Sequence, residues 1–291
     1  MLLESTTSVH SGGQDLASFL DERLMRCWRS FTKRLERCRE RCTEKRLHEL
    51  RVETRRLLAA ATVVEVIAPG HHLHGLTSCV KQIFRQSSRL RDTHVCAYLI
   101  EEELPLFPEL KPLRKALQKK EKRLLKEWER HIRMIKETRL KKLVRLSRHD
   151  VRRILDDAKS VRRCQGTLMA SVDGAHARTI RLLEHARNGS PARIHRLRIV
   201  FKKLRYLIEI LEPFIPGLSR RDLRHMNIWQ ETMGEIQDTA ILQAFLKKHN
   251  QKTGDGFRRF GTYLARREHR LIIQFLASAD RLVSFWPPHN S

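Results

Sequence analysis

A short basic pattern that occurs twice constrains this chain more than any other feature. The stretch from His195 to Tyr206 contains arginines and lysines but no acidic residue, and its apolar residues have helical spacing. On an α-helix, His195, Arg198, Lys202 and Arg205 lie within a narrow arc, and leucine and isoleucine lie on the opposite side. Like charges four residues apart destabilise a helix by roughly 0.2–0.5 kcal/mol per pair. The pattern therefore indicates a face that binds an anion.

The same pattern begins about 147 positions earlier, at His48. The matched pairs are Leu50 and Leu197, Arg51 and Arg198, and Arg55-Arg56-Leu57 and Lys202-Lys203-Leu204. A second motif, Leu90-Arg91-Asp92-Thr93, recurs at nearly the same separation as Ile236-Gln237-Asp238-Thr239. Two motifs in the same order at one separation predict a tandem duplication.

The charge of the chain narrows the class of partner. The 291 residues carry a formal net charge of +26, and the basic residues run through the whole sequence. A chain of this length can bury a substantial core. A charge so far from zero indicates a polyanionic partner: nucleic acid, inorganic polyphosphate or an acidic membrane surface.

Helical periodicity without alternating strand patterns predicts an all-α fold. Each half offers four helices with short connections, which is typical of an antiparallel bundle. The first 15 residues are expected to form a disordered tail. We expect one domain over 16–287, with repeat one at 16–138 and repeat two at 149–287. The expected helices are 15–44, 44–68, 73–103, 110–138, 150–187, 191–211, 219–249 and 257–285, with a connector at 140–147.

The basic helices contain the candidate anion contacts. Arginine suits bidentate phosphate contacts, and lysine supplies a mobile point charge. His48 and His195 begin the two patterns, and a bound anion would favour the protonated form of each imidazole. A further ladder, Lys81, Arg85 and Arg89, faces either the anion or water.

Other candidate sites are weaker. We expect Asp92 and Asp238 to hold neighbouring basic side chains in place rather than to bind a metal. Cys38 and Cys42 are expected to be packed thiols, and the tract His71-His72-Leu73-His74 lacks a fourth metal ligand. No metal, cofactor or catalytic residue is predicted, because the chain contains no phosphate-binding loop or nucleophile motif. The four tryptophans are expected in the core.

The chain shows no secretory leader and no apolar stretch long enough to span a membrane, so a cytoplasmic protein with reduced cysteines is expected. Its oligomeric state is open.

The repeated pattern His-x-Leu-Arg-(Val/Ile)-x-x-(Arg/Lys)-(Arg/Lys)-Leu, each time followed by an Asp-Thr motif, resembles the CHAD family (conserved histidine α-helical domain). The resemblance spans roughly residues 16–287. It implies two four-helix bundles related by a pseudo-two-fold axis around a central basic cavity, with inorganic polyphosphate as ligand. The contacts carried over by position are His48, Arg51, Arg55, Arg56, His195, Arg198, Lys202, Lys203 and Arg205.

This chain departs from an even distribution of contacts between the repeats. Leu58 stands opposite Arg205, and two glutamates dilute the first pattern. The alternating-glutamate motif of the tunnel enzymes often fused to the family is lacking, so hydrolysis is not implied.

The sequence thus predicts a non-enzymatic polyphosphate-binding protein, and polyphosphate granules are the expected location within the cytoplasm. Two alternatives stay open. One is a helical protein that binds RNA or DNA, which could also compete for the same site. The other is an enzyme that transfers or hydrolyses phosphate through one of the two histidines.

Overall fold

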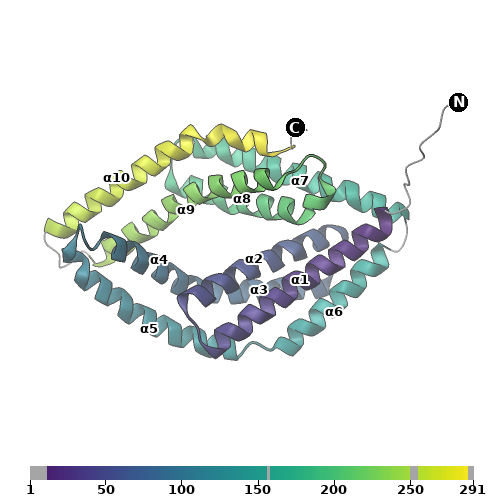
Figure 1. Ribbon diagram of the computed structural model, residues 1–291, viewed down its shortest axis with the longest axis horizontal. Helices are drawn as coiled ribbons and strands as arrows, with labels where there is room; N and C mark the ends of the chain where they lie inside the picture. Colours follow the sequence, from purple (N-terminus) through teal and green to yellow (C-terminus); the bar gives the residue numbers. More distant parts are fainter. Residues whose placement is uncertain (1–11, 156–157, 250–254, 288–291) are drawn as a thin grey trace.

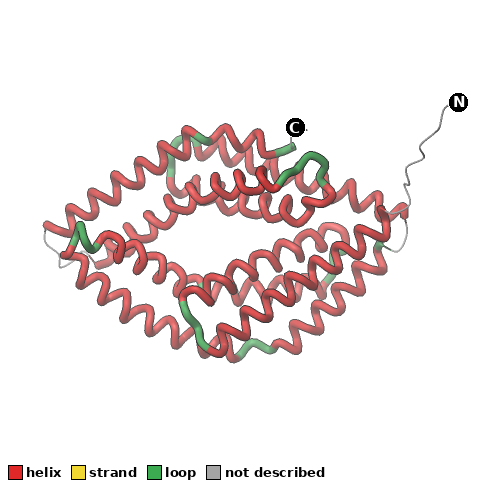
Figure 2. The backbone as a smooth tube through the Cα atoms, viewed as in Figure 1, coloured by secondary structure: helices red, strands yellow, loops and turns green. Residues whose placement is uncertain are grey.

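The computed structural model describes residues 12–155, 158–249 and 255–287, which form helices joined by short connections (Figures 1 and 2). No strand occurs in these residues, so the all-α prediction is confirmed. Within the described ranges, 3₁₀ helices cover Pro108–Leu110, Glu212–Phe214 and Ala279–Phe285. The α-helices of these ranges are α1 (Gly12–Glu40), α2 (Glu44–Ile67), α3 (His71–Gln86), α4 (Ser88–Glu103), α5 (Lys111–Arg133), α6 (Glu137–Ile154), α7 (Ala158–Ala186), α8 (Pro191–Leu211), α9 (Arg220–His249) and α10 (Asp255–Ala277).

The order of the helices repeats along the chain. The series α1, α2, α3–α4, α5 is followed by α7, α8, α9, α10, and α2 and α8 carry the two basic patterns. Helix α2 packs against α8, and α4 packs against α9. In Figure 1, α2 and α4 face α8 and α9 across the middle of the molecule. Equivalent helices of the two repeats thus meet at the centre. The pseudo-two-fold axis and the central cavity stay predictions.

Part of the N-terminal tail that was predicted over residues 1–15 is helical. Helix α1 begins at Gly12, inside the stretch predicted as a disordered tail. Residues 1–11 of that predicted tail lie outside the described residues.

The prediction of a connector at 140–147 is wrong, because α6 covers this stretch. Leu140, Val144, Ser147 and Val151 are buried and lie three or four residues apart, so they form a helical stripe. The stripe packs on α3 and α1. The break between helices falls earlier, between α5 and α6, and α6 spans the predicted junction of the two repeats.

The predicted third helix is divided into α3 and α4 at Ser87, whereas its counterpart α9 is continuous. The hydroxyls of Ser87 and Ser88 donate to the carbonyl of Phe84, at 2.8 and 3.0 Å, so they compete for a backbone acceptor at the break. Helix α7 runs through Gly166 and Gly174 without a break.

Helix α9 begins close to the predicted residue 219, and Ser219 caps it. The backbone N–H of Asp222 donates to the Ser219 hydroxyl, and the backbone N–H of Ser219 donates to the Asp222 carboxylate. These reciprocal bonds satisfy amides at the start of α9 that have no partner within the helix.

The basic helices are held by equivalent apolar stripes. Each stripe has members three or four residues apart that are at most 1% exposed. On α2 they are Leu47, Leu50, Thr54, Leu57, Ala61 and Val64; on α8 they are Ile194, Leu197, Phe201, Leu204, Ile208 and Leu211. The basic residues follow these positions by one residue, which is about 100° around the helix. Burial of the stripe therefore determines where the cations point.

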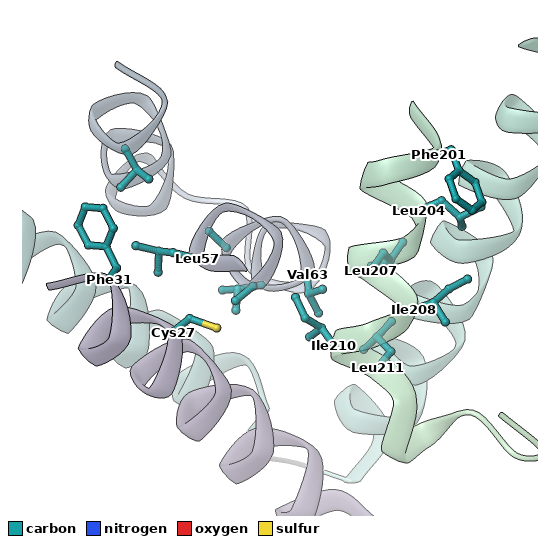
Figure 3. Close-up of a cluster of buried hydrophobic side chains, with 14 of the residues drawn as sticks. Cys27, Phe31, Leu57, Val63, Phe201, Leu204, Leu207, Ile208, Ile210 and Leu211 are labelled. Atoms are coloured by element: carbon teal, nitrogen blue, oxygen red, sulfur yellow. The ribbon is translucent and has the colours of Figure 1, made fainter. Parts of the chain in front are cut away.

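The core does not separate into one part per repeat. One continuous cluster of buried side chains includes α1, α2 and α8. Figure 3 shows Val63 of α2 next to Ile210 of α8, where the two basic helices meet. These residues are 0% and 4% exposed and occupy matched positions in the two repeats. Packing between the repeats is therefore part of the main core.

Replacing Leu197 by Ala is expected to lower the free energy of unfolding by about 2–5 kcal/mol, because it leaves a cavity beneath the basic face of α8. Ile199→Ala is the matched control on the same helix, since Ile199 is 43% exposed; its effect should stay within about 0.5 kcal/mol. Urea unfolding of both variants measures the difference. Equal losses would contradict the assigned orientation of α8.

Candidate anion-binding site

Five cations from the two basic helices gather where α2 meets α8: Arg51, Arg55, Arg198, Lys202 and Arg205. We call them the central basic cluster. Burial is the main cause that lowers the pKa of Lys202, to about 6, and repulsion from the four arginines adds to it. The four arginines belong to both repeats, so the structure brings together cations that are about 147 positions apart in sequence. Their repulsion would be relieved by a multivalent anion.

Arg51 is committed to the fold. Its Nη1 donates to the Phe84 carbonyl at 2.9 Å and to the hydroxyls of Ser87 and Ser88 at 2.7 and 3.2 Å. Its guanidinium also stacks on the Phe84 ring at 4.0 Å. Burial, with repulsion from Arg55, lowers the pKa of Arg51 to about 10. This side chain therefore binds the backbone at the α3–α4 break and has less freedom to meet a ligand.

Arg198, the counterpart of Arg51, has unused hydrogen-bonding capacity. Its buried Nε has no hydrogen-bond partner among the described residues. The guanidinium packs against α9 at Gly234, where an added Cβ would lie 3.4 Å from Nη2. Burial lowers the pKa of Arg198, and Asp238 partly offsets this effect. A buried donor without a partner is costly, so Arg198 is the better candidate for an anion contact.

Arg205 is 9% exposed and helps to order its neighbours. Its Nε donates to Gln230 and its Nη1 to Glu209, each at 3.1 Å. The guanidinium lies 4.4 Å from the centre of the Tyr206 ring, and the Tyr206 hydroxyl accepts from Nε of Arg55 at 3.3 Å. Arg205 and Tyr206 thus support Arg55 of the other repeat.

The two histidines lie at the ends of the cluster. Burial and Arg198 lower the pKa of His195, whose buried Nδ1 has no hydrogen-bond partner among the described residues. The pKa of His48 is lowered by burial, then by Arg91, Arg55 and Arg51. Both imidazoles therefore favour the neutral form without an anion, and the predicted protonation next to phosphate stays a prediction.

Some predicted contacts lie away from the cluster. Arg56 is exposed and donates to Glu53 at 2.7 Å, and Lys203 is exposed on α8. In the ladder on the third predicted helix, Lys81 and Arg85 lie exposed on α3. Arg89 is also exposed, and its charge helps to lower the pKa of Lys120 on α5. These exposed side chains point to solvent, and their contact with an anion stays a prediction.

The aspartates of the second motif lie close to the cluster. Burial raises the pKa of both Asp92 and Asp238, whereas Arg51 and Arg198, respectively, act to lower it. Neither forms a direct ion pair in the described part of the chain. The two carboxylates repel one another and also feel Arg91. Their closeness to the arginines supports the positioning role expected from sequence.

Sequence reasoning missed several participants. Arg91 belongs to the repeated motif, but only its aspartate was considered. Gln230 and Tyr206 carry no signal beyond helical spacing. Lys120 of α5 lies near Asp92 and over the Phe245 ring at 4.9 Å, a contact between distant segments that no local pattern could indicate.

The remaining sequence features are structural. Cys38 and Cys42 are buried thiols, and none of the six cysteines forms a disulfide. His72 contacts Asp150 at 3.1 Å through Nδ1. Across residues 12–155, 158–249 and 255–287, no group of three or more His, Cys, Asp or Glu is placed to hold a metal ion. No described helix is long and apolar enough to cross a membrane.

Comparison with known proteins identifies the class. The family model of the CHAD domain matches residues 22–247, so the chain belongs to the CHAD family. The crystal structure of the CHAD domain from the plant Ricinus communis is similar, with a TM-score of 0.63 at 16% identity, over 98% of this chain and 96% of that chain. This likeness shows a shared fold. Comparison with curated proteins finds no significant match.

The shifted pKa of Lys202 predicts how stability depends on pH. Its ordinary value of 10.5 falls to about 6 in the fold, so between these values the unfolded chain binds a proton that the folded chain lacks. Stability from this group therefore rises with pH, by at most about 1.4 kcal/mol per pH unit. Lys202→Met should stabilise the protein, with a gain that shrinks as the pH rises.

Urea unfolding of wild type and Lys202→Met at several pH values between about 7 and 9 measures this gain. The exposed neighbour supplies the control, Lys203→Met, whose difference from wild type should stay small at every pH. A gain from Lys202→Met that does not change with pH would show that Lys202 is charged in the fold.

Proposed function

We propose that this protein binds inorganic polyphosphate through the central basic cluster and that it does so without catalysing a reaction. The observation that carries the proposal is that four arginines, contributed by both repeats, surround the half-buried Lys202 and help to lower its pKa. Such an arrangement favours a ligand with several closely spaced negative charges. A flexible chain of phosphates could pass along α2 and α8 and contact the cations in turn.

Family membership supports this choice of anion, because polyphosphate binding is associated with CHAD proteins. The distribution of aromatic side chains supports it further. Trp28, Trp128, Trp229 and Trp286 are at most 8% exposed, as expected from the sequence, so they offer no surface on which bases could stack. Single-stranded nucleic acid is usually held by stacking in addition to phosphate contacts. RNA or DNA is therefore the second candidate, favoured by the net charge of +26 alone.

The non-enzymatic part of the proposal depends on the two histidines. The described residues provide no carboxylate within hydrogen-bond distance of His195 to orient its imidazole, as a general base usually requires. Release of phosphate from polyphosphate by wild type, abolished in His195→Ala or His48→Ala, would overturn this part. Location in the cytoplasm, on polyphosphate granules, also belongs to the proposal.

The binding test exploits two adjacent pairs of cations. Arg55 and Lys202 belong to the cluster, whereas Arg56 and Lys203 are their exposed neighbours. Arg55→Gln/Lys202→Gln should weaken binding of long-chain polyphosphate about 100-fold, because two charge-assisted contacts of roughly 1.5 kcal/mol each are lost. Arg56→Gln/Lys203→Gln removes the same charge but should weaken binding less than about threefold.

Titrations at about 150 mM salt with polyphosphate and with matched single-stranded RNA complete this test. Wild type should bind polyphosphate much more tightly than RNA. Equal weakening by the two double variants would mean that the overall charge, rather than the cluster, holds the ligand. Equal affinity for both polymers would favour the nucleic-acid candidate.

Binding should also depend steeply on salt. By analogy with single-stranded nucleic acid, about six phosphate contacts give a slope near −4 in a plot of log affinity against log salt concentration. Loss of two contacts in Arg55→Gln/Lys202→Gln should reduce the slope to about −3. A slope near zero for wild type would contradict electrostatic binding.

A further inference from the structure

An open hollow lies where the start of α2 meets the start of α4. It is lined by Glu44, Lys45, His48 and Arg91. Of these four residues, only His48 belongs to the contacts predicted from sequence. Three of the four are basic. Lys45 and Arg91 outweigh the single carboxylate of Glu44, so the hollow carries a net positive charge.

Arg91 is oriented by its acidic neighbour. Its Nη1 donates to Oε1 of Glu44 at 3.0 Å, and the Arg91 side chain keeps 26% of its surface exposed. Glu44 thus fixes the direction of the guanidinium, and the remaining N–H groups stay available for a second acceptor. Lys45 is exposed beside it and can move toward a ligand.

His48 lines the hollow and also feels the charges of the central basic cluster. After burial, the main causes that lower the pKa of His48 are Arg91, Arg55 and Arg51, so this imidazole lies between the hollow and the cluster. Arg91 also acts on the pKa of Arg51 and on that of Asp238 in the other repeat. A chain bound along the cluster would reach the hollow past His48.

The second repeat has no equivalent hollow residues. The positions matched to Glu44, Lys45 and Arg91 are Pro191, Ala192 and Gln237, respectively. None of these three can carry a charge. The two ends of the site therefore differ in the charged residues that a chain-like ligand would meet.

We propose that this hollow binds the terminal phosphate of a polyphosphate chain, an inference that rests on the function proposed above. A terminal phosphate carries more negative charge than an internal one, because its additional acid group titrates close to neutral pH. Arg91 supplies directed donors, Lys45 supplies a mobile charge, and His48 joins the end group to the rest of the chain. The protein would thus hold chains by one end, in one direction.

The test compares a short linear polyphosphate with the same chain whose two ends are blocked as phosphoramidates. Wild type should bind the free chain about tenfold more tightly, the effect expected for one charge-assisted contact. Arg91→Gln should bind both forms with the affinity that wild type has for the blocked chain. Lys45→Gln, which changes an exposed residue, should reduce the same preference and serves if Arg91→Gln fails to fold.

The matched control is Arg114→Gln. Arg114 resembles Arg91 in exposure, at 24%, and its Nε donates to Glu101 at 2.6 Å, but it lies on α5 away from the hollow. This variant should keep the tenfold preference. The inference is overturned if wild type binds both forms alike, or if Arg91→Gln weakens both equally. Failure of wild type to bind long-chain polyphosphate would instead refute the proposed function.

Discussion

Burial of one apolar stripe on each basic helix is the interaction on which the site depends. The stripes from Leu47 to Val64 and from Ile194 to Leu211 pack into the core and leave the adjacent positions, one residue later, to face the centre. Each large aliphatic side chain that becomes fully buried contributes roughly 1.5–3 kcal/mol. This stabilisation exceeds the repulsion among the cations, so the fold can hold Lys202 next to four arginines before any ligand arrives.

The two repeats use equivalent residues differently. Arg51 closes the α3–α4 break by binding the Phe84 carbonyl, whereas Arg198 packs beside a continuous α9 with its Nε unpaired. In the first repeat, Arg51 therefore has fewer N–H groups free than Arg198 has in the second. The first repeat also has Leu58 where the second has Arg205. It compensates at its end, where Arg91 replaces a glutamine. The two repeats therefore place different charged residues around the centre.

The sequence predicts much of this arrangement because both motifs act locally. Helical spacing places Arg198 and Lys202 on one face, and the repeat identifies Arg51 and Arg55 as their counterparts. The sequence could not show that Arg51 donates to the Phe84 carbonyl, because this hydrogen bond joins two separate helices. The helix α6 was mistaken for a connector although Leu140, Val144 and Val151 have helical spacing. Lys120 and Gln230 reach the site only through tertiary packing, which no local pattern encodes.

The packing of α2 on α8, with Val63 next to Ile210, has a consequence for how the sequences of the two repeats can diverge. Matched residues also lie side by side at the interface of a symmetric dimer, next to its two-fold axis. In a dimer of identical subunits, every substitution would appear on both sides of that interface. When both copies occupy one chain, each side can vary alone. Because one chain contains both repeats, α2 can have Leu58 at the position where α8 has Arg205.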